Sequence, residues 1–136
     1  MHNPPVTLPR ASRTRTRWLA VAALAAVSST LGCGGETDNR PAKWSFIAAT
    51  IVEPTCATAS CHSAFTQRAG VDLHERNIGY RSLTERLFVR GGMPAASPLL
   101  TIMRGQGSIR MPPDFALPDA DIELISDWIM AGATNE

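Results

Sequence analysis

Apolar side chains between residues 42 and 136 recur at intervals of three and four residues, the spacing of one face of an α-helix. No segment in this range alternates between apolar and polar positions as a half-buried strand does. The pattern is clearest over 118–132, where an apolar face, two acidic residues in the first turn and a terminal glycine occur together: Ile122, Ile125, Trp128 and Ile129; Asp119 and Asp121; Gly132. We therefore expect an all-α domain.

Three further helices are expected in the same domain. The first covers 43–52, with an apolar stripe that includes Trp44 and Phe46, and Pro54 is expected to end it. The second begins at Ser82, because Glu85 three residues later completes a capping box, and ends near Val89 before two glycines. The third covers 98–103, with a proline at the favoured first position and Gly105 after its end. A short helical turn is expected around 56–62.

The first 41 residues follow a different pattern. Four arginines lie between positions 10 and 17, an apolar run follows over 18–27, and small residues lead to Cys33. This is the order of a secretory signal, and the run of about ten apolar residues is too short to cross a membrane, which takes about 20. We therefore expect a signal peptide over 1–32.

The segment Thr30-Leu31-Gly32-Cys33 resembles the cleavage box of bacterial lipoproteins, although Thr30 stands where an aliphatic residue is usual. The resemblance implies a lipid on Cys33, a flexible polar tether over 33–41, and a domain anchored to a membrane of the cell envelope, at the outer membrane or the periplasmic face. Ordinary cleavage nearby, which would leave Cys33 as a free thiol, is the alternative.

The composition fits one compact domain after the leader. The chain has 136 residues, of which 44% are hydrophobic and 18% charged. The net charge of +1 comes from the leader, because without its four arginines nine basic residues face twelve acidic ones. No basic run remains, so we expect no nucleic-acid binding.

The most informative segment is Cys56-Ala57-Thr58-Ala59-Ser60-Cys61-His62. It resembles the attachment motif of c-type haem, with four residues between the cysteines in place of the usual two. The resemblance implies one covalent haem c, with Cys56 and Cys61 as thioether positions and His62 as the proximal iron ligand. Three alternatives stay open: a Cys56–Cys61 disulfide, a zinc site that includes His62, and unpaired core thiols.

A second iron ligand is expected from a methionine. Met111 stands beside two prolines in a loop before the last helix, Met93 is its rival, and His74 is a further alternative. Met103 and Met130 occupy helical spacing among apolar residues and are expected in the core.

The order of helix, attachment motif, methionine loop and final helix resembles a class I cytochrome c. Residues 56–133 most closely resemble the single-haem domains of bacterial lipoproteins. This resemblance implies Met111 as the distal ligand, and first and last helices that cross near the haem edge, with Phe46 packed against Trp128.

These features together predict a one-electron carrier that exchanges electrons with redox partner proteins of the cell envelope. We do not expect an enzyme, because iron held by both His62 and Met111 has no open position for a substrate. The first alternative is a haem-free helical interaction module of the envelope, closed by the Cys56–Cys61 disulfide. The second is a five-coordinate haem that binds small gases or peroxide, which requires that neither Met111 nor Met93 reaches the iron.

Overall fold

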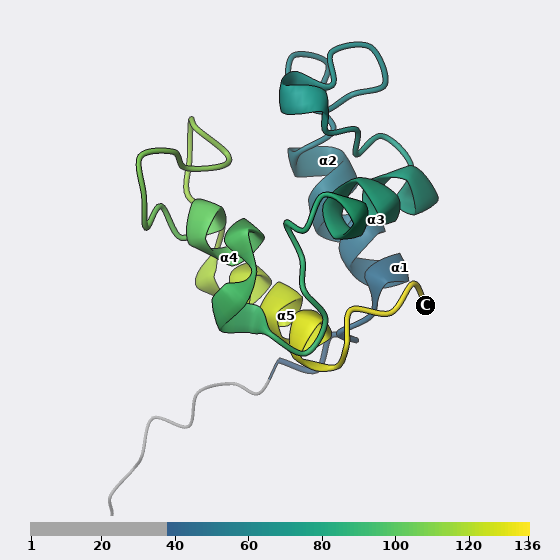
Figure 1. Ribbon diagram of the computed structural model, residues 1–136, viewed down its shortest axis with the longest axis vertical. Coiled ribbons are helices and arrows are strands. Elements are labelled where there is room, and N and C mark those ends of the chain that lie inside the picture. Colours follow the sequence, from purple (N-terminus) through teal and green to yellow (C-terminus); the bar gives the residue numbers. More distant parts are fainter. Residues whose placement is uncertain (1–37) are drawn as a thin grey trace, which may run out of the picture. The chain divides into compact units, whose positions relative to one another are not determined.

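The computed structural model describes residues 38–136, and all regular elements in that range are helical (Figure 1). In chain order they are α1 (Trp44–Ile47), η1 (Ala48–Val52), α2 (Glu53–Thr55), η2 (Arg68–Gly70), α3 (Arg76–Glu85), η3 (Pro94–Ala96), α4 (Pro98–Met103) and α5 (Asp119–Met130). The expected all-α class is confirmed, since residues 38–136 contain no strand. The predicted signal peptide over 1–32 and Cys33 lie outside the described residues.

The first helix is longer than expected, because Pro54 does not end it. The α-helical turn α1 passes into the π-helical turn η1, in which the N–H of Glu53 donates to the carbonyl oxygen of Ala48 five residues earlier. Pro54 then lies inside α2, and the chain stays helical to Thr55. In a regular α-helix the proline ring clashes with a carbonyl group four residues earlier. The wider π-turn just before Pro54 relieves that clash.

Helix α3 lies earlier in the chain than predicted, so the expected helix from Ser82 to Val89 was wrong. It begins at Arg76, contains Ser82 in its interior and ends before Leu87, which has a left-handed φ of 59°. The cause is packing, because Gly79 and Leu83, four residues apart, are the buried positions of this helix. Gly79 lies close to Trp44: a methyl group at Gly79 would lie 3.5 Å from that indole ring.

The last two predicted helices are confirmed. Helix α4 begins at Pro98, and the chain turns at Gly105 with a φ of 65°. Helix α5 covers Asp119–Met130, and Gly132 follows it with a φ of 106°. The expected apolar face of α5 is buried. Ser97 is buried before α4 and accepts a hydrogen bond of 3.0 Å from the N–H of Arg90, which fixes the preceding loop.

Two tryptophans connect the first and the last helix. The rings of Trp44 in α1 and Trp128 in α5 stack with their centroids 5.0 Å apart. Tyr80 in α3 packs against both rings, tilted to that of Trp44 at 6.1 Å and edge-on to that of Trp128 at 6.4 Å. The expected contact of the two helices is therefore present with a different residue, because Trp44 and not Phe46 stacks on Trp128. Phe46 is only partly buried beside the core.

Each polar atom of this aromatic cluster has a backbone acceptor. The indole of Trp44 donates to the carbonyl of Arg76, and the indole of Trp128 donates to that of Thr134, both at 2.9 Å. The Tyr80 hydroxyl donates to the carbonyl of Ala133, also at 2.9 Å. The cluster therefore ties the segment after α5 to the helices.

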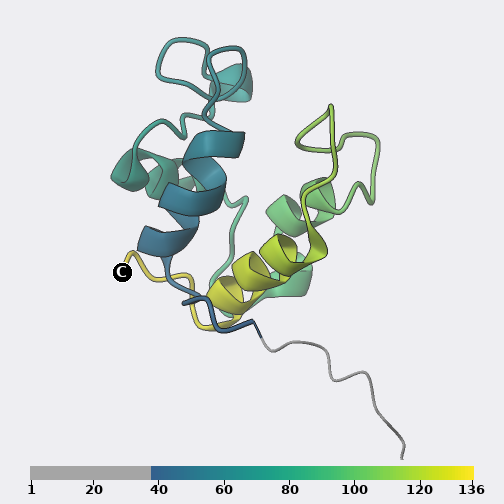
Figure 2. The same cartoon turned by 180° about the vertical axis from the view of Figure 1, so that it is seen from behind.

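The helices form two groups. In both views α1, α2 and α3 lie together, α4 and α5 lie together, and the long loops 56–73 and 104–118 project from the same end (Figures 1 and 2).

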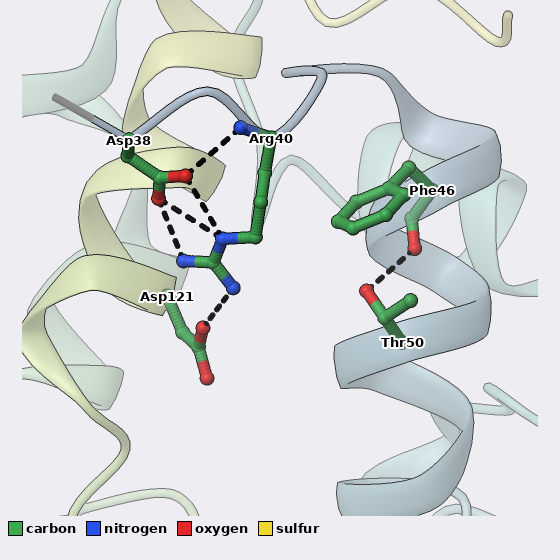
Figure 3. A network of polar contacts seen from close by, with 5 residues as sticks. All are labelled: Asp38, Arg40, Phe46, Thr50 and Asp121. Atoms are coloured by element: carbon green, nitrogen blue, oxygen red, sulfur yellow. Dashed lines mark hydrogen bonds and ion pairs between the residues drawn. The ribbon is translucent and has the colours of Figure 1, made fainter.

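An ion pair connects the segment before α1 to α5. Arg40 donates to Asp38 and, at 2.6 Å, to Asp121 in the first turn of α5 (Figure 3). Among the described residues, no helix is long and apolar enough to span a membrane.

Candidate functional site

A cavity of about 290 Å³ is lined by residues of both helix groups and both long loops. This volume lies near the lower end of the range for ligand pockets, roughly 300–1,000 Å³. The lining is mostly aliphatic and includes Ile51, Val52, Leu83, Leu99, Ile102 and Ile125. Among the lining residues of the described chain, Arg68 alone carries a permanent charge. The lining of the cavity therefore suits an apolar ligand.

The loop 56–73 holds His62 on the cavity wall through its backbone. The expected helical turn is absent here, and hydrogen-bonded turns take its place. The N–H of His62 donates to the carbonyl of Cys56 at 3.1 Å, and the carbonyl of His62 accepts from the N–H of Leu73 at 2.8 Å. These bonds fix the backbone of His62 on both sides.

The ring of His62 is oriented as well. Its Nδ1 lies 3.1 Å from the carbonyl oxygen of Val71. Because a carbonyl oxygen only accepts, Nδ1 carries the proton in this contact and Nε2 keeps its lone pair. A hydrogen bond from one ring nitrogen to a backbone carbonyl is the usual way in which proteins orient a metal-binding histidine. His62 is therefore suited to bind a metal through Nε2.

Cys56 and Cys61 both line this cavity, and both are free thiols in the structure. Cys56 follows α2 and packs against the core, and burial together with the charge of Cys61 raises its pKa to about 11. Hydrogen bonds with the side chains of Thr58 and Ser60 lower the pKa of Cys61, and the Ser60 hydroxyl lies 3.6 Å from its sulfur. The two thiols are thus only five positions apart in the chain but differ in acidity.

The loop 104–118 brings Met111 to the same cavity. Its N–H donates to the carbonyl of Ile102 at 3.2 Å, and Arg110 donates to the carbonyl of Pro113 at 3.1 Å. Met111 is partly buried and lines the cavity. Met93, its rival in the sequence, is 55% exposed and is not among the lining residues. The structure thus separates the two candidates.

The remaining candidates fall at other places. His74 is exposed outside the cavity lining, where its Nδ1 lies 2.6 Å from a carboxylate oxygen of Asp72. Met130 is 64% exposed, so its expected place in the core was wrong: it ends α5 on the side away from the buried tryptophan face. Met103 is buried as expected, but it also lines the cavity. Sequence spacing identified it only as a core residue.

The residues on the cavity wall fit a covalently attached haem. They supply two thiols, an imidazole whose Nε2 is available, a thioether sulfur from the other loop and an apolar lining. A structural zinc site normally has four ligands, and residues 38–136 contain no cluster of three His, Cys, Asp or Glu side chains that could hold a metal ion. The donor types on this wall are compatible with a covalently attached porphyrin.

Comparisons of the chain with models of protein families, with curated proteins and with solved structures give no match. The function is therefore inferred from the site residues.

Proposed function

We propose that this protein is a one-electron carrier whose cavity holds a single covalent c-type haem. One observation carries the proposal. Cys56, Cys61, His62 and Met111, which the sequence separates by up to 55 positions, line the same apolar cavity. When bound, the haem supplies one-electron chemistry by cycling between ferric and ferrous iron.

The two cysteines attach the haem in this proposal. Each thiol adds across one vinyl group, so that its sulfur bonds to one carbon and its hydrogen goes to the next. No external oxidant is required for this addition. The free state of Cys56 and Cys61 in the structure supports this role. The four residues between them are small, which leaves the loop free to bring both sulfurs to one edge of a planar ligand.

In this proposal His62 and Met111 are the residues that would hold the iron. The hydrogen bond from His62 to Val71 orients the ring, as is usual for a metal-binding histidine. Met111 supplies a neutral sulfur, and a histidine–methionine pair raises the reduction potential. With both positions filled, no site is open to a substrate, which supports a carrier and not an enzyme.

We place the carrier in the cell envelope, anchored to a membrane by a lipid on Cys33 and serving redox partner proteins there. The described domain gives no support for nucleic-acid binding, since nine basic residues face eleven acidic ones between residues 38 and 136.

The decisive experiment is an absorption spectrum of the reduced, denatured protein, produced from the full chain in bacteria that have the c-type attachment machinery. We expect haem that stays with the polypeptide and shows the bands of two saturated vinyl groups. The variants Cys56→Ala and Cys61→Ala should each keep one thioether, and the remaining vinyl group should move the bands to longer wavelength.

A matched control and a contrary outcome complete the test. Cys33→Ser should keep the haem spectrum but move the protein from the membrane fraction to the soluble fraction. A colourless protein with two fewer titratable thiols would contradict the proposal. Cys56 and Cys61 would then form a disulfide, and the haem-free interaction module would take the place of the carrier.

A further inference from the structure

Two methionines line the cavity, although the sequence indicates only one as a ligand. Met103 is 6% exposed and lies at the C-terminal end of α4, and Met111 lies eight positions later on the loop 104–118. Both belong to the part of the domain formed by α4, α5 and that loop, whereas His62 belongs to the part formed by α1–α3 (Figure 1). Two methionines from the other part of the domain therefore line the same cavity as His62.

The backbone keeps these two methionines together. The N–H of Met111 donates to the carbonyl of Ile102, the residue directly before Met103, at 3.2 Å. This bond links the loop to the last turn of α4. A molecule that fills the cavity between His62 and Met111 therefore also meets the side of α4 that carries Met103.

The two side chains differ in how their backbone is supported. Met103 is the last residue of a regular helix, and the N–H of the next residue, Arg104, donates to the carbonyl of Leu100 at 3.0 Å. Met111 lies in a stretch of turns and bends. A displacement of the loop 104–118 would therefore carry Met111 along more readily than Met103.

Met103 also has room to change its conformation. It lines a second cavity of about 330 Å³ as well, and with Leu117 it separates this cavity from the first. An unbranched thioether has three rotatable side-chain bonds and adapts to irregular spaces. Space on both sides allows the sulfur to turn further into the first cavity.

We infer that Met103 is a reserve axial ligand, which donates a sulfur lone pair to the haem iron when Met111 withdraws. This inference rests on the proposed function. Ligand exchange of this kind moves no electron and releases no group other than the Met111 sulfur. Its consequence is that opening of the loop 104–118 does not create a vacant iron position. The protein would thus stay an electron carrier and exclude small ligands in both states of the loop.

The test uses the haem-loaded full chain with the variants Met111→Ala, Met103→Leu and the double variant. Leucine keeps the volume and apolar character of methionine but has no sulfur. We expect Met111→Ala to keep a low-spin, six-coordinate spectrum and to bind carbon monoxide at least tenfold more slowly than the double variant. Met93→Leu, at an exposed position outside the cavity lining, is the control and should match the unchanged protein.

Three results would overturn the inference. A high-spin spectrum and fast carbon monoxide binding in Met111→Ala would show that Met103 does not reach the iron. If the double variant does not fold, the result for Met111→Ala is sufficient. A low-spin spectrum that persists in the folded double variant identifies another ligand. A changed spectrum in Met103→Leu alone makes Met103 the resting ligand. Absence of haem from every variant and from the unchanged protein refutes the proposed function instead, so the two failures are distinguishable.

Discussion

The two loops that line the cavity differ in how firmly the rest of the protein holds them. In the loop 56–73, His62 is fixed by two backbone hydrogen bonds and by the contact of its ring with Val71. In the loop 104–118, Met111 has one backbone hydrogen bond, to Ile102. Figure 2 shows this second loop extending well beyond α4 and α5. The loop 56–73 thus holds His62 by several hydrogen bonds within the protein, whereas the loop 104–118 holds Met111 by one.

This difference indicates that the position of Met111 depends on the proposed haem more than the position of His62 does. A ligand position held by backbone hydrogen bonds keeps its geometry without the cofactor, whereas a loop with few hydrogen bonds belongs to the part of a protein that opens most easily. We therefore expect the bond from Met111 to the iron to stabilise its own loop. The loop 56–73, which carries His62, should instead keep its conformation in the haem-free protein.

The largest effect should follow from removing the cofactor. The double variant Cys56→Ala/Cys61→Ala leaves the cavity of about 290 Å³ without its ligand, which costs up to about 7 kcal/mol at roughly 24 cal/mol per Å³. That is comparable to the whole stability of a small domain, about 5–15 kcal/mol. Thermal unfolding followed by circular dichroism should show a large drop in Tm.

Amide hydrogen exchange at low temperature then separates the two loops in the same variant. Exchange should become fast over 104–118, while the amides of His62 and Leu73 stay protected. Equal loss of protection in both loops would show that the loop 56–73 also depends on the haem.

The next effect concerns the contact that joins the two helix groups. Trp128→Ala removes the ring stacked 5.0 Å from Trp44 and should lower the free energy of unfolding by about 3–5 kcal/mol. Met130→Ala, two residues later on the exposed side of α5, should change it by less than about 0.5 kcal/mol. Urea titration of both variants measures the difference. Similar values for the two would mean that the aromatic stack does not join the groups.

A smaller effect tests whether the loop 56–73 is formed in the cofactor-free chain. The pKa of Cys56 is raised to about 11 and that of Cys61 is lowered, so at any pH below 11 the thiolate fraction is greater at Cys61. Because only the thiolate is alkylated, Cys61 should react with iodoacetamide faster than Cys56, by roughly tenfold once the lower nucleophilicity of the more acidic thiolate is counted. Mass spectrometry of the labelled peptides gives both rates. The difference should vanish in urea, and its absence in the native buffer would mean that this loop is not preformed.

The smallest effect is expected from the ion pair between Arg40 and Asp121, which joins the segment before α1 to α5. Both side chains are partly exposed, so Arg40→Gln should lower the unfolding free energy by no more than about 1 kcal/mol. The loss should shrink in high salt, because salt screens the pair. A salt-independent loss would point to packing of the arginine stem instead of its charge.

The sequence predicted those elements whose signals are local. Helix α5 has its acidic first turn, its apolar face and its terminal glycine within 15 residues, and α4 has a proline at its start. Helix α3 was misplaced because its position depends on Gly79 packing against Trp44, a contact 35 residues away in the chain. Trp44, rather than Phe46, stacks on Trp128 because Trp44 shares the buried face of this helix with Ile47 and Ala48, whereas Phe46, two positions later, is turned about 200° from it.

Some residues of the candidate site could be chosen from the sequence, and others only from the structure. Cys56, Cys61 and His62 lie within seven residues of the chain, so a sequence motif was sufficient to choose them. The distinction between Met111 and Met93 needed the structure, since both stand beside prolines after glycine-containing turns. Met103 could not have been selected from its spacing, because a helical methionine that faces a cavity and one that fills a core have the same pattern.

The π-helical turn η1 has a consequence for the length of the chain between Trp44 and Cys56. A π-turn contains one residue more than an α-turn, and each residue of an α-helix adds about 100° of rotation. Deleting the exposed Ala49 would restore a plain α-helix and leave Cys56 facing nearly the same way relative to Trp44, because the wider turn absorbs the one extra residue. The helix therefore tolerates a shortening at this turn, whereas removing a residue from a regular α-helical stretch would rotate Cys56 by about 100° away from its place on the cavity wall.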